Sequence, residues 1–276
     1  MARILIAGCG YVGAALARQL AGHGHEVFGL RRSSGKETPG VRWVSADLAR
    51  RETLADLPVD LDHVFYSAAA DGSTEEAYHR AYVQGARNLL TALEAQGTSP
   101  KRVFFTSSTG VYGQSGGEWV DETSPTEPPR ATGRILLEAE AVFHAGPFPA
   151  TVLRLAGIYG PGRTRLIDQV RHGEAYLPSG PPLYTNRIHR DDCAGALAHL
   201  MELQDPAAVY LGVDHEPVLK SDVQAWIATR LDLPPLPEPP TGVTPAGKRC
   251  RNARLVESGY TFLYPSFREG YGEILG

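Results

Sequence analysis

The sequence predicts an α/β protein built on a doubly wound parallel sheet, and three observations lead to this prediction. First, an apolar run at residues 4–7 turns directly into a glycine-rich segment and then into a helix-patterned stretch. Second, strand-like and helical runs keep alternating as far as residue 155, as they do in βαβ units. Third, a chain of 276 residues that is 42% hydrophobic can bury a large core.

The glycine-rich turn at residues 8–13 carries the first functional signal. Gly8, Gly10 and Gly13 form a G-x-G-x-x-G pattern between the predicted strand and helix. One glycine permits a tight bend, one lets phosphates approach the backbone and one lets the helix pack closely, while the helix N-terminus faces the anion. We therefore predict a Rossmann-type fold in which this turn, including Tyr11 and Val12, binds a dinucleotide. A glycine turn without a ligand is the alternative.

The second predicted strand, residues 26–30, ends in Arg31, Arg32, Ser33 and Ser34. A site for NAD would offer an acidic residue about 20 residues after the glycines to bind the ribose 2′-hydroxyl. No acidic residue stands at this strand end, whereas guanidinium and hydroxyl groups suit a 2′-phosphate. The sequence thus predicts NADP(H) in preference to NAD(H). The alternative is a solvated, positively charged loop.

The remaining elements follow the same rhythm. Strands are expected at residues 41–45, 63–67, 102–107 and 150–155, with helices at 75–96 and 133–144. We assign residues 1–157 to an NADP(H)-binding domain and 158–276 to a smaller C-terminal substrate lobe. Proline and glycine become dense after Tyr159, so this lobe is expected to consist largely of loops. Its residues 190–212 have the patterns of a helix and a short strand, and they are expected to return to the core.

Composition and charge exclude several classes of function. The net charge of −4 gives no broad positive surface for nucleic acid or for an anionic membrane. The three cysteines, Cys9, Cys193 and Cys250, show no C-x-x-C spacing, so we predict neither a disulfide framework nor a metal site. No apolar run reaches the roughly 18 residues of a membrane span. These features favour a protein of the reducing cytoplasm.

Seven segments carry a joint pattern over most of the chain. They are GCGYVG (8–13), SADL (45–48), YSAAA (66–70), GARNLL (85–90), SSTGVYG (107–113), LRLAGIYGPG (153–162) and NRIHRDD (186–192). Together they resemble the extended short-chain dehydrogenase/reductase superfamily, which contains NAD-dependent epimerases and dehydratases acting on sugar nucleotides.

The resemblance implies roles for further residues. Asp47 and Leu48 are expected to lie against the adenine, and Ala68 and Ala69 along the cofactor. Ser108 takes the position of the active-site serine or threonine. The segment of Gly157 and Ile158 adds two further residues to the cofactor site of the superfamily, and we include both in the predicted site.

One part of the superfamily pattern is missing. Its members use Tyr-x-x-x-Lys on the helix that begins near residue 133, where the lysine lowers the pKa of the tyrosine for proton transfer. In this chain Thr132 and Leu136 occupy those positions, and no Tyr-x-x-x-Lys occurs anywhere. A threonine hydroxyl is a far weaker acid than a phenol, and leucine carries no charge. The chain is thus similar to an atypical subgroup that keeps the cofactor half of the site.

Candidates for the chemistry lie on the loop after the strand at residues 102–107. Ser108, Thr109 and Tyr112 follow this strand, and ligands bind at the carboxyl ends of such strands. We predict that Ser108 orients the substrate; the alternative is that its hydroxyl caps the loop backbone. Tyr112 or Tyr159 can supply a phenol, or these rings line the pocket. His189 can titrate near neutrality, although in the superfamily its segment is mainly structural.

The resulting hypothesis is an NAD(P)-binding oxidoreductase or an epimerase/dehydratase-like enzyme with a non-standard active site. Its substrate is expected to be a sugar nucleotide or a small carbonyl compound, and the resemblance to the superfamily implies a homodimer that pairs through the two long core helices. The alternative is a redox sensor or scaffold that binds NADP(H) without turnover, because dinucleotide binding alone does not separate these classes.

Overall fold

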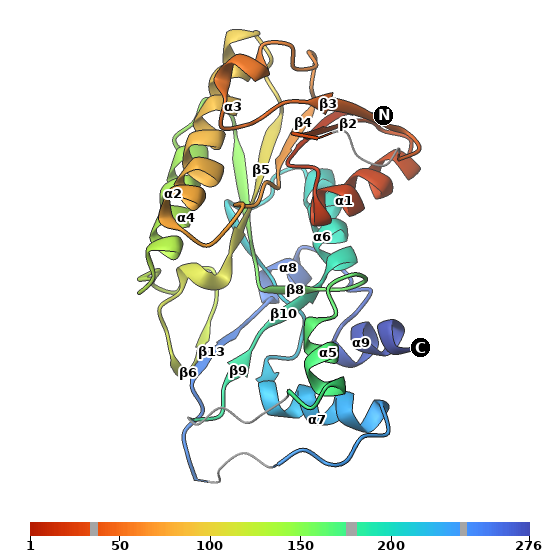
Figure 1. Ribbon diagram of the computed structural model, residues 1–276. Coiled ribbons are helices and arrows are strands. Elements are labelled where there is room, and N and C mark those ends of the chain that lie inside the picture. Colours follow the sequence, from red (N-terminus) through yellow and green to blue (C-terminus); the bar gives the residue numbers. More distant parts are fainter. Residues whose placement is uncertain (34–37, 175–180, 238–241) are drawn as a thin grey trace.

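A seven-stranded parallel sheet organises the structure, a computed structural model that describes residues 1–33, 38–174, 181–237 and 242–276 (Figure 1). The strand order is β11-β7-β5-β4-β1-β2-β3. The bounds are β1 Arg3–Ala7, β2 Glu26–Arg31, β3 Val41–Ser45, β4 His63–Tyr66, β5 Arg102–Ser108, β7 Ala150–Leu155 and β11 Val209–Gly212. This architecture confirms the predicted fold class. Each predicted strand is found within one or two residues of its expected bounds.

Helices cover both faces of the sheet. In Figure 1 α2, α3 and α4 lie on one side of it, and α1 and α6 on the other. The bounds are α1 Tyr11–Gly22, α2 Glu75–Tyr78, α3 Gly85–Ala95, α4 Ala131–His144 and α6 Arg190–Glu202. Alternate residues of β1 serve the two layers: Leu5 joins the core beneath α3 and α4, and Ile4 and Ile6 join the core beneath α1 and α6. A strand buried on both faces is therefore continuously apolar.

The helix expected at residues 75–96 is interrupted by a π-helical turn, His79–Gln84, between α2 and α3. The buried Tyr66 causes this interruption, because its hydroxyl donates to the carbonyl of Ala81. A Cβ atom at Gly85 would overlap the same hydroxyl, so only glycine fits there. A side chain that enters the hydrogen-bond ladder produces such a bulge.

The C-terminal region contains more regular structure than expected. It holds α5 Arg165–Arg171, α7 Lys220–Arg230, α8 Ala253–Glu257 and α9 Phe267–Leu275. Tyr159, Ile167, Ile227 and Phe267 belong to a separate hydrophobic core here. The prediction of a lobe made largely of loops was wrong, because helices that lie between the proline- and glycine-rich segments pack around this separate core. The helix at 190–203 and the strand at 209–211 appear as α6 and β11, and β11 pairs with β7.

Short strand pairs lie outside the main sheet. They are β6 (Gly116–Val120) with β13 (Gly247–Cys250), β8 (Gly157–Tyr159) with β10 (Arg187–His189), and β9 (Tyr184–Thr185) with β12 (Val218–Leu219). The β6–β13 pair joins the C-terminal region to the segment after β5. Short 3₁₀ turns cover Arg51–Leu54 and Thr109–Val111. The β8–β10 pair places the segment after β7 beside the carboxyl edge of the main sheet (Figure 1).

Asp214, just beyond β11, makes stability depend on pH. It is 2% exposed, and this burial raises the pKa of its carboxyl to about 7. An unfolded aspartate titrates near pH 4, about 3.9. The folded chain therefore binds the proton more tightly, and the stability contributed by the protonated carboxyl is complete below about pH 4 and lost as the pH rises to about 7.

We expect Asp214→Asn to lose this dependence. Across about pH 4 to 7 the free energy of unfolding of the wild type should fall relative to that of the variant, and outside this window the difference should be constant. Urea denaturation at several pH values measures it. Asp205→Asn is the control, since the Asp205 side chain is 95% exposed. Parallel curves for the wild type and Asp214→Asn would contradict the prediction.

Candidate cofactor and active site

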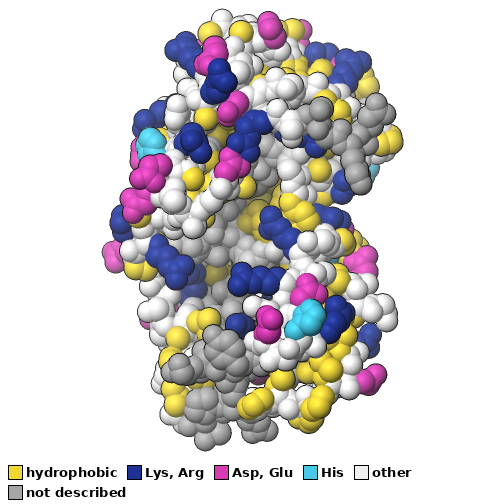
Figure 2. Space-filling model, viewed as in Figure 1, with side chains coloured by type: hydrophobic (Ala, Val, Ile, Leu, Met, Phe, Trp, Pro, Cys, Tyr) yellow, Lys and Arg dark blue, Asp and Glu magenta, His cyan; other side chains and the backbone are white. Residues whose placement is uncertain are grey.

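A cavity of about 940 Å³ opens at the carboxyl ends of the central strands. Its walls come from the loops after β1, β2, β3, β4 and β5, the segment after β7 and the start of α4. From β1 the chain runs outward to β2 and β3, and it then returns to β4 and β5 on the other side of β1. Ligands bind at such a switch point in open α/β sheets. In the space-filling view this face is hollowed in the middle, with Lys and Arg side chains around the hollow (Figure 2).

The three glycines after β1 have three distinct physical roles. Gly8 has a φ of +89°, and a Cβ atom there would overlap the backbone nitrogen of Ala68. At Gly13 a Cβ atom would lie 2.7 Å from the carbonyl oxygen of Gly8, so this glycine lets α1 approach the turn. At Gly10 the nearest heavy atom would be 4.0 Å away, which leaves open space toward the cavity.

The first turn of α1 is suited to an anion. No side chain caps the N-terminus of α1, and its first turn contains no acidic residue. The backbone N–H groups there and the helix dipole favour a phosphate. The open space at Gly10 and this uncapped helix end fit the pyrophosphate of a dinucleotide.

Two arginines stand where the adenosine is expected. The guanidinium of Arg31 lies 3.6 Å from the centre of the Trp43 ring. Arg32 donates through both terminal nitrogens to the carboxylate of Asp71, which comes from the loop after β4. This hydrogen bonding holds the pKa of Asp71 below its ordinary value. Both arginines and Ser33 line the cavity.

The charge of the cavity differs from that of the whole chain. Six arginines and two aspartates are among the described residues that line it: Arg31, Arg32, Arg50, Arg80, Arg130, Arg163, Asp47 and Asp71. The complete chain has a net charge of −4, so positive charge is concentrated here. Such a cavity favours a ligand that carries several negative charges.

Of the three residues predicted to carry the chemistry on the loop after β5, Ser108 lines the cavity. Its Oγ accepts a hydrogen bond of 3.0 Å from the N–H of Gly110 and thereby caps the short 3₁₀ turn. This is the loop-capping alternative considered above, but it uses only a lone pair of the oxygen. The hydroxyl hydrogen remains able to donate to a ligand.

Thr109 and Tyr112 do not line the cavity, which corrects the expectation that they act in the site together with Ser108. Both are buried, because the 3₁₀ turn directs the chain back toward the core. The Tyr112 hydroxyl accepts a hydrogen bond of 2.7 Å from Arg154, and burial raises the pKa of this phenol to about 12. His189 is also fully buried and outside the cavity wall, and its Nδ1 accepts from the N–H of Asp191 in the first turn of α6.

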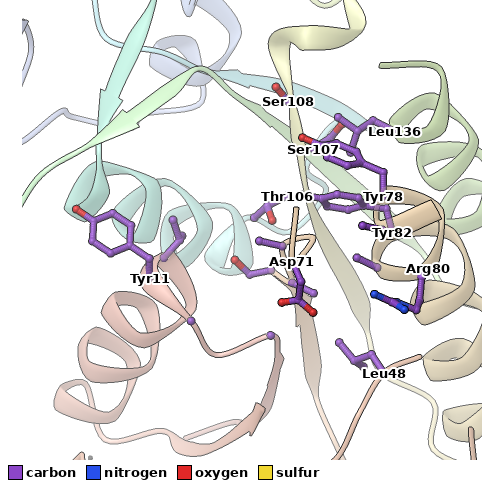
Figure 3. Close-up of a pocket in the computed structure, with 18 of the residues that line it drawn as sticks. Tyr11, Leu48, Asp71, Tyr78, Arg80, Tyr82, Thr106, Ser107, Ser108 and Leu136 are labelled. Carbon is purple, nitrogen blue, oxygen red and sulfur yellow. The ribbon is translucent and has the colours of Figure 1, made fainter. Parts of the chain in front are cut away.

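Two tyrosines, for which the sequence predicted no role, also line the cavity beside the end of β5. Tyr78 and Tyr82 reach from α2 and the π-helical turn toward the end of β5 (Figure 3). Burial raises the pKa of Tyr82, and a hydrogen bond from the backbone of Ala70 opposes this shift. The spacing of i and i+4 within the helix predicted at 75–96 is the signal that would have placed both on one face. Leu136 and Thr132 also line the cavity.

The structure brings most of the predicted cofactor residues into one cavity wall. They are Gly8, Gly10, Tyr11, Val12, Arg31, Arg32, Ser33, Asp47, Leu48, Ala68, Ala69 and Ile158. Gly13 lies behind this wall, and Gly157 is held in β8 by a 3.2 Å hydrogen bond from its N–H to the carbonyl of Asn186. Ser34 lies outside the described residues.

A Rossmann sheet with an uncapped glycine turn and a positively charged crevice defines a dinucleotide-binding α/β protein. The model of the NAD-dependent epimerase/dehydratase family matches residues 4–210, and the chain belongs to this family. This confirms the resemblance to short-chain dehydrogenases and reductases. The chain is an NAD(P)-dependent oxidoreductase or epimerase in the broad sense of that family.

Individual relatives agree with this assignment. Protein YeeZ of Escherichia coli (strain K12) is 29% identical over 228 residues, which cover 76% of this chain and 77% of that protein. The 2-alkyl-3-oxoalkanoate reductase of Stenotrophomonas maltophilia (strain K279a) is 27% identical over 217 residues, with coverage of 73% and 64%. The chain also resembles the solved structure of a Methylobacillus flagellatus protein that is assigned to the NAD-dependent epimerases/dehydratases. The two sequences are 40% identical, and the match covers 99% of this chain and 97% of that protein, with a TM-score of 0.85.

Proposed function

We propose that this protein is an NADP(H)-dependent oxidoreductase that acts on a carbonyl or hydroxyl group of a small or sugar-like molecule. The observation that carries the proposal is the joint placement of Arg31 and Arg32, the glycine turn and Ser108 along one positively charged cavity. The similarity to a reductase of 2-alkyl-3-oxoalkanoates supports a carbonyl substrate. When bound, the cofactor supplies or accepts the hydride.

The residues at the inner end of the cavity orient the substrate. Ser108 donates its hydroxyl hydrogen to the substrate oxygen, because the hydrogen bond from the N–H of Gly110 leaves this hydrogen available. The proton that accompanies hydride transfer moves through water or through the phenols of Tyr78 and Tyr82, which face the same space (Figure 3). Leu136 provides an apolar wall where relatives are expected to carry lysine.

The preference for NADP(H) is tested by Arg31→Ala and Arg32→Ala. We expect each substitution to weaken NADPH binding about tenfold or more, about 1.4 kcal/mol per factor of ten, and to leave NADH nearly unchanged. Fluorescence titration measures both dissociation constants. Arg18→Ala, an exposed arginine on α1 outside the cavity wall, is the matched control.

A companion variant separates the two residues of the ion pair. Asp71→Asn keeps Arg32 but removes the carboxylate that it now binds, so NADPH affinity should hold or rise. A wild type that binds NADH as tightly as NADPH would overturn the proposed preference. The predicted homodimer and the cytoplasmic location remain predictions, and none of the described helices could span a membrane.

A second candidate function is a redox sensor that binds NADP(H) without turnover. Thr132 and Leu136 favour it. Both line the cavity, and they stand at the positions where the resemblance to the superfamily leads one to expect tyrosine and lysine. A sensor requires clearly different affinities for NADP⁺ and NADPH. Oxidation of NADPH in the presence of any compound from a panel of carbonyls and nucleotide sugars would exclude this function, since a sensor performs no hydride transfer.

A further inference from the structure

Tyr11 joins the cofactor turn to the loop between β8 and α5. It is the first residue of α1, and its hydroxyl donates a 3.1 Å hydrogen bond to the carbonyl of Pro161. The guanidinium of Arg163 lies 4.2 Å from the centre of the Tyr11 ring. Arg163 also lines the cavity, so the second lobe contributes a cation directly beside the N-terminus of α1.

The backbone of this loop is fixed in place. The N–H of Arg163 donates a 2.9 Å hydrogen bond to the carbonyl of Gly160, which closes a tight turn. Gly160 has a φ of +143°, and a Cβ atom there would lie 3.0 Å from the Tyr11 hydroxyl and 3.1 Å from Nε2 of His189. The turn therefore fits against Tyr11 and the buried His189, and it carries Arg163 to one position.

The charge of Arg163 is not neutralised by the protein. Within the described ranges it forms no ion pair with an acidic side chain, and it is exposed. Arg190 provides the contrast: its guanidinium lies 5.4 Å from the same ring but is paired with Asp191 at 2.7 Å and does not line the cavity. Of these two arginines beside Tyr11, Arg163 is the one whose charge faces the cavity.

We propose that Arg163 is a ligand of the cofactor's pyrophosphate, opposite the N–H groups of the glycine turn. The uncapped first turn of α1 supplies backbone donors from one side. The planar guanidinium supplies two parallel N–H donors from the other side, the geometry that phosphate oxygens accept best. Cofactor binding thus ties the 160–164 loop to α1. The inference rests on dinucleotide binding in the proposed function, and it is independent of the preference for NADP(H).

Arg163→Met tests this role, because methionine keeps an unbranched apolar stem and removes the charge. Titrations with NADPH, NADH and ADP-ribose should show affinities weakened about tenfold for all three, since each carries the pyrophosphate. Arg163→Lys should recover part of the loss. Arg165→Met, on an exposed arginine two residues away that does not line the cavity, should bind all three ligands like the wild type.

Thermal unfolding of the ligand-free variants separates binding from structure. A purely structural role in packing on Tyr11 predicts a lower melting temperature for Arg163→Met and unchanged affinities, which would overturn the proposal. Equal affinities in Arg163→Met and Arg165→Met would also overturn it.

The pattern of ligands distinguishes this inference from the proposed NADP(H) preference. Failure of Arg31→Ala and Arg32→Ala to separate NADPH from NADH affects only that preference, because NADH and ADP-ribose report on Arg163 without a 2′-phosphate. A loss confined to NADPH in Arg163→Met would place Arg163 at the 2′-phosphate and overturn its assignment to the pyrophosphate. A wild type that binds none of the three ligands would overturn both.

Discussion

Replacing Glu140 by alanine is expected to lower the free energy of unfolding by about 3–5 kcal/mol. Glu140 lies in α4, and its carboxylate accepts hydrogen bonds of 2.7 and 3.0 Å from Arg154 and 2.6 Å from the Ser107 hydroxyl. The Glu140 and Arg154 side chains are only 6% and 8% exposed. Removal of the carboxylate leaves a guanidinium buried without its counter-ion, which costs far more than the loss of a surface ion pair.

The same contacts connect this stability to the site. Ser107 lies at the end of β5 directly before Ser108, so Glu140 fixes the strand end that presents the substrate-orienting hydroxyl. Urea denaturation measures the effect. The double variant Glu140→Leu/Arg154→Met should recover most of the stability, because an apolar pair of similar volume removes both charges. Ser107→Ala should lose less, about 1.5–3 kcal/mol, because it removes one hydrogen bond to the carboxylate and keeps the ion pair. A loss in Glu140→Ala no larger than in Ser107→Ala would contradict the prediction.

Alanine at Gly8 and alanine at Gly10 should have separable consequences. At Gly8 the residue needs a φ of +89° and its Cβ atom would overlap Ala68, so Gly8→Ala should lose both stability and cofactor binding. The left-handed backbone alone costs about 1–2 kcal/mol for a residue with a Cβ atom, and the overlap adds to this. Gly10→Ala meets no protein atom closer than 4.0 Å and should fold normally.

Cofactor binding is where Gly10→Ala should fail. Its methyl group would occupy the open space through which phosphates approach the backbone, so we expect NADPH affinity to fall at least tenfold, about 1.4 kcal/mol. Thermal unfolding without ligand and fluorescence titration of NADPH measure the two properties separately. Gly22→Ala, at the end of α1 with nothing within 4 Å of the added atom, is the control for both. Normal NADPH binding by Gly10→Ala would contradict the assignment of the glycine turn.

The cofactor half of the site could be predicted from the sequence because it is encoded in local patterns. The glycine turn joins one strand to the next helix, and Arg31 and Arg32 end the following strand, so short segments fix their positions. The expected place of Thr109 and Tyr112 on the cavity wall failed for a reason that no spacing shows. Ser108 caps a 3₁₀ turn that sends both residues into the core, where Tyr112 meets Arg154.

The sequence alone therefore determined the sheet, its order of elements and the turn where the dinucleotide is expected, because hydrophobic periodicity and glycine spacing act over a few residues. The tertiary structure decided which side chains complete the cavity. Tyr82 is presented by a π-helical turn that the buried Tyr66 induces, and Tyr78 by the end of α2 directly before this turn. Arg163 reaches Tyr11 from a loop far along the chain. Such contacts depend on how separate segments pack against one another, which only the folded chain as a whole fixes.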